Sequence, residues 1–352
     1  MSGREARPGA GLDRRALLHL AAAAGVGAAA FPLSSLASSG AVDFPQDHPH
    51  WQFVFVNHAL TNPFFVPAKN GSQDACALVG TRSEWTGSLS SDVGEMVQAM
   101  HDAIEAKVDG IAVSIIDPTA FDRPTAVALE HGIPVIAYNA DGGKSNMRLA
   151  YIGQDLYESG LEFGARIVQL VGRGDVFLFI ATPGQQNIQP RVDGALDAIR
   201  DSGSPIHVEV VATGVSVGDE RKRVEATYQA HRGARGYFAV DAGSTQGVAE
   251  LMRRHGLHAK GVRAGGYDLL PETLRAIRDR VLDFTIDQQP YLQGFLPVIQ
   301  LFLSRYSGSL VAPADTNTGL NFVTAANVAR YLTTRSRYEG SSTREVFPVT
   351  EG

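Results

Sequence analysis

The sequence contains few of the residues from which disulfides and metal centres are built. Cys76 is the only cysteine among 352 residues, which excludes an internal disulfide and leaves the compartment undecided by cysteine usage. The HExxH pattern and paired cysteines are absent, and the ten histidines are scattered along the chain. The segment 141–144, DGGK, departs from a calcium loop at the first repeated acid. We therefore expect no metal ion.

Nucleotide-binding and nucleophile motifs are also absent. No GxxxxGK[ST] phosphate loop occurs, and no GxGxxG follows a strand and opens a helix. The segment 242–246, AGSTQ, misses the GxSxG pattern of a hydrolase elbow by register. Nothing in the chain demands that a bond be broken. We expect no cofactor, no catalytic residue and no enzymatic activity.

Positive charge is not in excess. The chain carries 31 Lys and Arg against 37 Asp and Glu, a net charge of −6. Nucleic acids and anionic membranes attract basic surfaces, so this balance disfavours both as partners. We expect no nucleic acid partner.

No apolar run reaches the roughly 20 residues that a membrane-spanning helix needs. The longest candidate, residues 17–31, follows the paired Arg14 and Arg15 and precedes small residues through Ala41. This order is typical of a cleavable export signal and resembles a twin-arginine signal. No cysteine follows the run, which excludes a bacterial lipid anchor. We predict an export signal over residues 1–41, a mature chain beginning near Val42, and a periplasmic or extracytoplasmic location.

Short apolar runs alternate with amphipathic segments from Trp51 onward, and the plan repeats in the second half. The runs are continuously apolar, which indicates parallel strands covered by helices on both faces. The fold class is therefore α/β, with two doubly wound parallel-sheet lobes. Predicted strands cover 51–56, 109–115, 133–137, 149–152, 176–181, 207–212, 236–240, 261–267, 283–286 and 320–323; predicted helices cover 63–79, 93–104, 119–131, 156–171, 188–199, 221–231, 245–255 and 290–306.

A two-lobe chain has a cleft between its lobes, which is a default small-molecule site. We assign residues 50–153 plus 289–316 to the first lobe and 154–288 plus 317–334 to the second, with a C-terminal tail over 335–352. Crossings near Gly153, Gln288 and residues 317–319 predict a three-segment hinge.

Polar and aromatic residues follow the predicted strands, where parallel sheets bind ligands. Their mixture suits a neutral polyhydroxylated ligand, because carboxylates and amides bind hydroxyls and aromatic faces cover C–H groups. The predicted ligand-binding residues are Asn62, Phe64, Phe65, Trp85, Asn139, Asp141, Arg191, Asp241, Asp268 and Gln288.

Each of these residues also has a structural interpretation. Phe64, Phe65 and Trp85 suit a core, Asp and Asn cap helices and shape turns, and Arg191 suits a surface. Asp117, which precedes a proline, is interpreted as a cap and left out of the site. His58 lies near the predicted cleft, where a hydrogen-bonded structural histidine is the favoured interpretation. Recurrence at successive strand ends favours the binding interpretation for the ten.

Six short motifs in order carry a family resemblance: 61–65 (TNPFF), 132–135 (GIPV), 191–194 (RxxG), 238–241 (FAVD), 265–268 (GGYD) and 285–290 (TIDQQP). With them the mature chain resembles the type I periplasmic sugar-binding proteins of ABC importers, the ribose-binding-protein-like group. The resemblance implies that Phe64 and Phe65 sandwich a ligand and that Asn62 binds a hydroxyl. It implies further hydrogen bonds from Arg191, Asp241, Asp268 and Gln288.

One segment departs from the ribose-binding pattern. Those relatives carry Asp-Arg after the fourth strand, whereas this chain has Asn139-Ala140 followed by Asp141. Loss of that arginine argues against ribose, and residues 139–141 with 153–155 resemble a subgroup that includes sugar-alcohol binders.

The resemblance implies a monomeric solute-binding protein that delivers a neutral carbohydrate or polyol to a membrane ABC permease. Three alternatives share the fold: the two-lobe sensor of a transcriptional regulator, an α/β enzyme, and a chemoreceptor-coupled sensor. The regulator would need a helix-turn-helix where this chain has its apolar signal.

Overall fold

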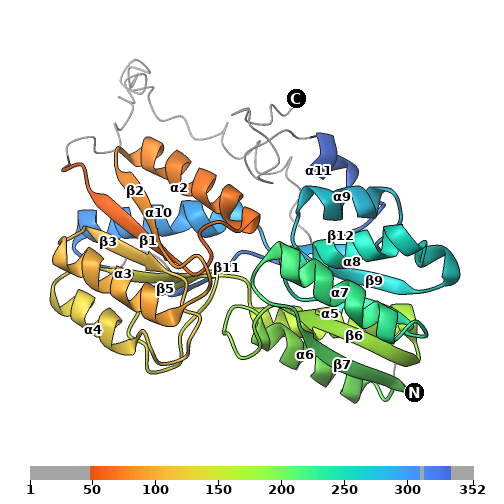
Figure 1. Ribbon diagram of the computed structural model, residues 1–352. Coiled ribbons are helices and arrows are strands. Elements are labelled where there is room, and N and C mark those ends of the chain that lie inside the picture. The colour runs from red at the N-terminus through yellow and green to blue at the C-terminus, as the bar shows by residue number, and fades with distance from the viewer. Residues whose placement is uncertain (1–47, 310–312, 334–352) are drawn as a thin grey trace, which may run out of the picture. The chain divides into compact units, whose positions relative to one another are not determined.

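The computed structural model describes residues 48–309 and 313–333, which belong to one compact unit, Asp47–Gly352 (Figure 1). The predicted export signal, residues 1–41, and the predicted tail, residues 335–352, lie outside the described residues. In the part of the chain that is described, no helix is long and apolar enough to cross a membrane.

The first lobe is built on a six-stranded parallel sheet of order β11-β5-β4-β3-β1-β2. Side chains of β1 alternate between two cores, with Phe53 and Phe55 on one face and Val54 and Val56 on the other. Both faces are covered, so the strand is apolar throughout. The strands are β1 (Gln52–Asn57), β2 (Arg82–Gly87), β3 (Gly110–Val113), β4 (Val135–Tyr138), β5 (Ala150–Gly153) and β11 (Asp315–Asn317); the helices are η2 (Pro63–Phe65), α2 (Val66–Val79), α3 (Val93–Glu105), α4 (Asp122–Glu130) and α10 (Pro290–Ser307).

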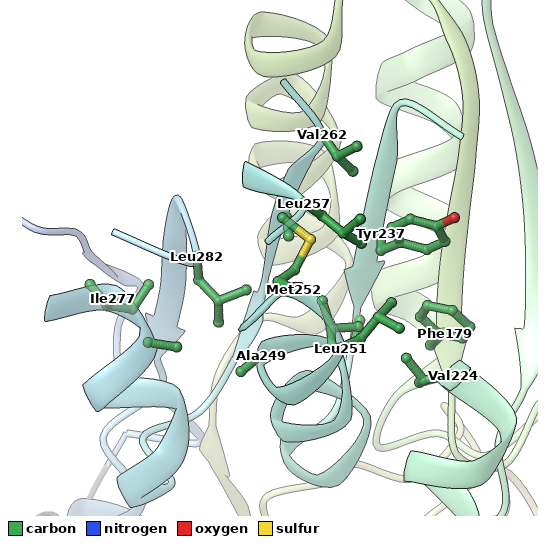
Figure 2. Packing of buried hydrophobic residues seen from close by; sticks show 14 of the residues in the cluster. Phe179, Val224, Tyr237, Ala249, Leu251, Met252, Leu257, Val262, Ile277 and Leu282 are labelled. Carbon is green, nitrogen blue, oxygen red and sulfur yellow. The ribbon is translucent and has the colours of Figure 1, made fainter. Parts of the chain in front are cut away.

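The second lobe repeats this plan with a sheet of order β12-β10-β9-β8-β6-β7. Its two cores lie on opposite faces of β6, and Figure 2 shows Val224 of α7 near Phe179 of β6 in one of them. The strands are β6 (Gly174–Ile180), β7 (Ile206–Ala212), β8 (Gly236–Ala239), β9 (Arg263–Tyr267), β10 (Phe284–Asp287) and β12 (Asn321–Val323); the helices are α5 (Leu156–Val171), α6 (Gln189–Asp201), α7 (Val217–Ala230), α8 (Ala242–His255), η3 (His258–Lys260), α9 (Pro271–Arg278) and α11 (Ala329–Thr333).

These sheets confirm the predicted α/β fold with two parallel-sheet lobes, with some differences in detail. β12 pairs with β10 in the antiparallel direction. The strands β2 and β11 were not predicted, because both lie at sheet edges and carry polar, partly exposed sequences, RSEWTG and DTN. The helix α9 was not predicted either, because a helix of eight residues is too short to show a clear 3.6-residue hydrophobic period.

The chain passes between the two sheets three times. It leaves β5 of the first sheet for α5, returns from β10 of the second sheet to α10, and runs from β11 of the first sheet to β12 of the second. Near these passages the Thr318 hydroxyl makes two hydrogen bonds: Oγ1 donates to the carbonyl of Gln288 at 2.8 Å and accepts from the side-chain amide of Gln293 at 3.2 Å. Hydrogen bonds therefore tie the second and third passages together.

Glycines allow two helix pairs to pack closely. A Cβ atom on Gly294 of α10 would overlap the carbonyl oxygen of Ala68 in α2, and one on Gly71 of α2 would overlap that of Tyr291. In the second lobe, a Cβ on Gly160 of α5 would lie 2.5 Å from the carbonyl oxygen of Arg191 in α6. The close approach of α5 and α6 thus positions the helix turn that carries Arg191.

Candidate ligand-binding site

A cavity lies where the carboxyl ends of strands from both sheets face each other. Residues just beyond β1, β4, β8, β9 and β10 line it, together with the first turn of α6. This is the edge at which open parallel sheets bind ligands. Its lining comprises His58, Asn62, Phe64, Phe65 and Asn139 from the first lobe, and Asn187, Ile188, Arg191, Asp241, Ala242, Asp268 and Gln288 from the second lobe and its border.

The structure brings eight of the ten predicted residues to this cavity and leaves out Trp85 and Asp141. Trp85 lies within β2 rather than beyond a strand end. Its ring stacks on Phe55 at 4.7 Å, and its Nε1–H donates to Ser72 at 3.0 Å. The prediction of Trp85 as a lining residue is corrected: Trp85 does not line the cavity, and its ring lies 6.3 Å from the ring of the lining residue Phe65.

Asp141 points to a different cavity and is corrected too. Arg148 donates to both of its carboxylate oxygens, at 2.7 and 2.5 Å, and also reaches Asp315 at 3.0 Å. These groups line a second cavity of about 420 Å³, whereas the strand-end cavity has about 50 Å³ of free space. The larger space is lined by an ion pair already satisfied within the protein. Volume alone therefore does not identify the ligand site.

Arg191 is the central donor of the strand-end cavity. Its side chain is 2 % exposed and lies 4.3 Å over the ring of Tyr267. Nη1 donates to the carbonyl of Val240 at 2.9 Å, and Nη2 donates to Gln154 at 3.4 Å. Nε finds no acceptor among the described residues. A buried charged donor without a partner is costly, so this atom favours a ligand that brings an oxygen.

Two buried carboxylates lie with this arginine. Asp268 accepts from Gln288 at 2.7 Å, and burial raises the pKa of Asp268 to about 7 although Arg191 and that hydrogen bond favour its charged form. Asp241 accepts from the backbone N–H groups of Ala181 at 2.9 Å and Ser244 at 2.8 Å. It thereby caps α8, as the structural interpretation of the sequence held, and lines the cavity as well.

The first-lobe side of the cavity combines aromatic rings with amides. Phe64 and Phe65 meet edge to face at 4.8 Å and belong to the core, so they are core and lining residues at once. Asn62 accepts from the Phe64 N–H at 3.0 Å and caps η2. Asn139 stands in the left-handed region at φ 64° and donates to Gln293 at 3.1 Å. Local capping and turns thus place these side chains at the strand ends.

Four lining residues were absent from the predicted set: His58, Asn187, Ile188 and Ala242. His58 is hydrogen-bonded through both ring nitrogens, since its Nδ1 lies 2.9 Å from Ser114 Oγ and its Nε2 lies 3.1 Å from Asn187 Nδ2. Asn187 lies in the loop that follows β6. Its position after a strand end could have identified it as a lining residue. The contact joins the two lobes.

Two more hydrogen bonds cross between the lobes beside it. The N–H of Gln186 donates to the carbonyl of Ile116 at 3.0 Å, and the side chain of Gln185 donates to the carbonyl of Ser91 at 3.3 Å. The loop 185–187 of the second lobe therefore holds the cavity closed against the first lobe. In the described ranges, no group of three or more His, Cys, Asp or Glu residues is arranged to hold a metal ion.

We expect acid to destabilise this closed structure through His58. Burial lowers the pKa of His58 to about 4. The stability it contributes is present above its unfolded pKa of about 6.5 and is lost as pH falls towards the folded value, about 2 kcal/mol by pH 4.5. Thermal unfolding between about pH 7 and 4.5 should show a smaller loss in His58→Gln than in the wild type.

The exposed His207 supplies a matched control. His207→Gln should follow the wild-type curve. Parallel curves for His58→Gln and the wild type would show that His58 does not titrate in this way.

The chain is similar to known proteins in both sequence and fold. The chain is 51% identical over 311 residues to the xylose/arabinose-binding protein of Sulfolobus acidocaldarius, covering 84% of this chain and 76% of that protein. An ABC transporter solute-binding protein from Burkholderia graminis, solved with D-arabinose, matches with a TM-score of 0.74 and 26% identity over 81% of this chain and 97% of its own. A carbohydrate transporter from Acidothermus cellulolyticus, solved with myo-inositol, matches with a TM-score of 0.73 and 25% identity, over 83% and 100%.

These likenesses extend over both lobes and confirm the resemblance carried by the six motifs. The model of the periplasmic binding protein domain matches residues 53–302, from β1 to the end of α10. The chain belongs to the periplasmic binding protein domain family.

Proposed function

We propose that this protein captures a neutral sugar or sugar alcohol between its two lobes and delivers it to an ABC permease. The observation that carries the proposal is the buried Nε of Arg191, unpartnered among the described residues, in a cavity that also holds Asp241 and Asp268. A sugar hydroxyl both donates and accepts, so one ligand satisfies the arginine and the carboxylates together.

The charges of the cavity favour a neutral ligand. An anion would meet Asp241 and Asp268, and a cation would meet Arg191. Phe64 and Phe65 offer apolar surface to the C–H groups of a sugar ring. Binding of xylose, arabinose and D-arabinose by similar proteins, according to their names, supports an aldopentose as the ligand of this chain.

The three passages between the sheets support a hinge. We assign 50–153 plus 289–316 to the first lobe and 154–288 plus 317–334 to the second. With the lobes closed, the cavity has about 50 Å³ of free space, so a ligand enters only when the lobes part. The three hydrogen bonds of loop 185–187 would break on opening and re-form around the ligand.

A solute-binding role also accounts for export, for binding without catalysis and for a monomeric state. The predicted export signal would carry the protein out of the cytoplasm, and binding without turnover needs no catalytic group. A monomer suits lobes that must close freely. Incubation with a bound sugar should return the sugar unchanged by nuclear magnetic resonance; steady conversion would favour the enzyme alternative.

A thermal-shift screen of the mature protein tests the proposal. The panel contains pentoses, hexoses, pentitols and tetritols, each in large excess. A ligand at about 100 times its dissociation constant adds about 2.7 kcal/mol of stability, which raises the melting temperature measurably. We expect the largest shift with an aldopentose. If no sugar or polyol raises the melting temperature, the proposed function is wrong.

A further inference from the structure

Glu220 is a buried acid that does not line the cavity. It lies in the first turn of α7 and is 3% exposed, while its neighbour Asp219 is exposed. Its Oε2 receives no hydrogen bond from a described donor. Burying an ionised carboxylate without a partner costs several kcal/mol, so such a group is expected to be neutral or to have a special neighbour.

That neighbour is the beginning of α8. A Cβ atom on Gly243 would overlap Oε2 of Glu220, so only glycine leaves room for the carboxyl there. The Glu220 carboxyl hydrogen-bonds with the side chain of Asp241, the residue that caps α8 and lines the cavity. Glu220 therefore contacts a cavity carboxylate without lining the cavity itself.

The surroundings show which of the two acids holds a proton. Asp241 accepts from the N–H of Ser244 in the first turn of α8 and from the N–H of Ala181 after β6, and both bonds stabilise its charge. Burial and the charge of Asp241 raise the pKa of Glu220, to which Asp219 adds a smaller effect of the same sign. Burial raises the pKa of Asp241 too, but the hydrogen bond from Glu220 lowers it.

The other charged groups nearby do not replace this arrangement. On α7, Arg221 is paired with Glu250 of α8 at 2.6 Å. Beyond Asp241, Asp268 adds another negative charge, and Arg191 acts on Asp268. Two carboxyl groups in hydrogen-bond contact share one proton, and here the proton belongs on Glu220.

We propose that Glu220 is a positioning residue: as a carboxylic acid it donates a hydrogen bond to Asp241 and fixes the carboxylate that meets a sugar hydroxyl. This inference rests on the proposed function. Glu220, which lies outside the cavity, would orient Asp241, an acceptor inside it. This role explains why α7 carries a buried acid beside Gly243.

Two substitutions separate the hydrogen bond from the shape of the side chain. Glu220→Gln keeps a donor for Asp241, whereas Glu220→Met keeps a similar length without one. Calorimetric titration with D-xylose and D-arabinose should show affinity within about threefold of the wild type for Glu220→Gln, and a loss of about tenfold for Glu220→Met, as expected for a hydrogen bond to a charged group.

The ligand-free protein gives an independent readout. An acid whose folded pKa is raised contributes stability at low pH that is lost as pH rises, and glutamine removes this dependence. The melting temperature of Glu220→Gln minus that of the wild type should therefore grow between about pH 5 and 8.5. Glu209→Gln, at an exposed glutamate of β7, should show a constant difference.

The outcomes separate this inference from the proposed function. Wild-type binding with unchanged affinity in Glu220→Met overturns the positioning role and leaves the proposed function standing. A constant melting difference for Glu220→Gln overturns the proton assignment, and this series decides the matter if Glu220→Met does not fold. Failure of the wild type to bind any sugar contradicts both proposals.

Discussion

Arg191→Met should weaken sugar binding at least about tenfold, because the loss of a hydrogen bond from the buried, charged Nε costs about 1.5 to 3 kcal/mol. Methionine fills much of the same space over Tyr267, so the effect on binding comes from the lost donors. Calorimetric titration with the pentose that gives the largest thermal shift measures it.

The same change also removes the donor to the carbonyl of Val240, which should lower the unfolding free energy by about 1 to 3 kcal/mol. Arg166→Met is a matched control, since Arg166 lies over the ring of Phe322 at 4.9 Å and does not line the cavity. It should bind sugar as the wild type does. Wild-type affinity in Arg191→Met would remove Arg191 from the site.

Gly294→Ala should have the largest effect on stability, about 3 kcal/mol or more, because the added methyl group overlaps the backbone of α2. Backbone cannot rotate away as a side chain can, so α10 and α2 must move apart. These helices begin directly after Gln288–Gln289 and after Phe65, so separation would also disturb two parts of the cavity wall. Chemical denaturation measures the loss, with sugar affinity as a second readout.

Gly233→Ala is the control for this experiment. A Cβ atom there meets nothing within 4 Å, and the residue is exposed. Its effect should stay within about 0.5 kcal/mol. Equal unfolding free energies for Gly294→Ala and Gly233→Ala would show that α2 and α10 do not pack as closely as described.

Much of the fold follows from local pattern. Continuously apolar strands such as β1 and β8 are read directly from the sequence, because both of their faces are buried. The edge strands β2 and β11 have no such signal, since one side of each makes no ladder and their residues are polar. Strand ends likewise predicted eight of the cavity residues, because parallel strands bring their carboxyl ends to one edge.

The failures share a cause. Position along the chain places a residue near the edge of a sheet but does not say which way its side chain points. Asp141 lies three residues beyond β4, where Arg148 holds it away from the cavity, and Trp85 lies inside a strand that the pattern did not reveal. Glu220 showed no signal at all, because nothing in the sequence of a polar helix marks one acid as buried.

The sequence by itself determined the parallel α/β lobes, the family, and the residue types offered at the strand ends, since these depend on periodicity and on short-range order. Only the tertiary structure decided which of the side chains after the strand ends come together at the cavity. It left Nε of Arg191 without a protein acceptor among the described residues, paired Asp141 with Arg148, and placed Glu220 in contact with Asp241. Those outcomes depend on contacts between residues distant in the chain, where burial and neighbouring charge, rather than residue type, set what each group does.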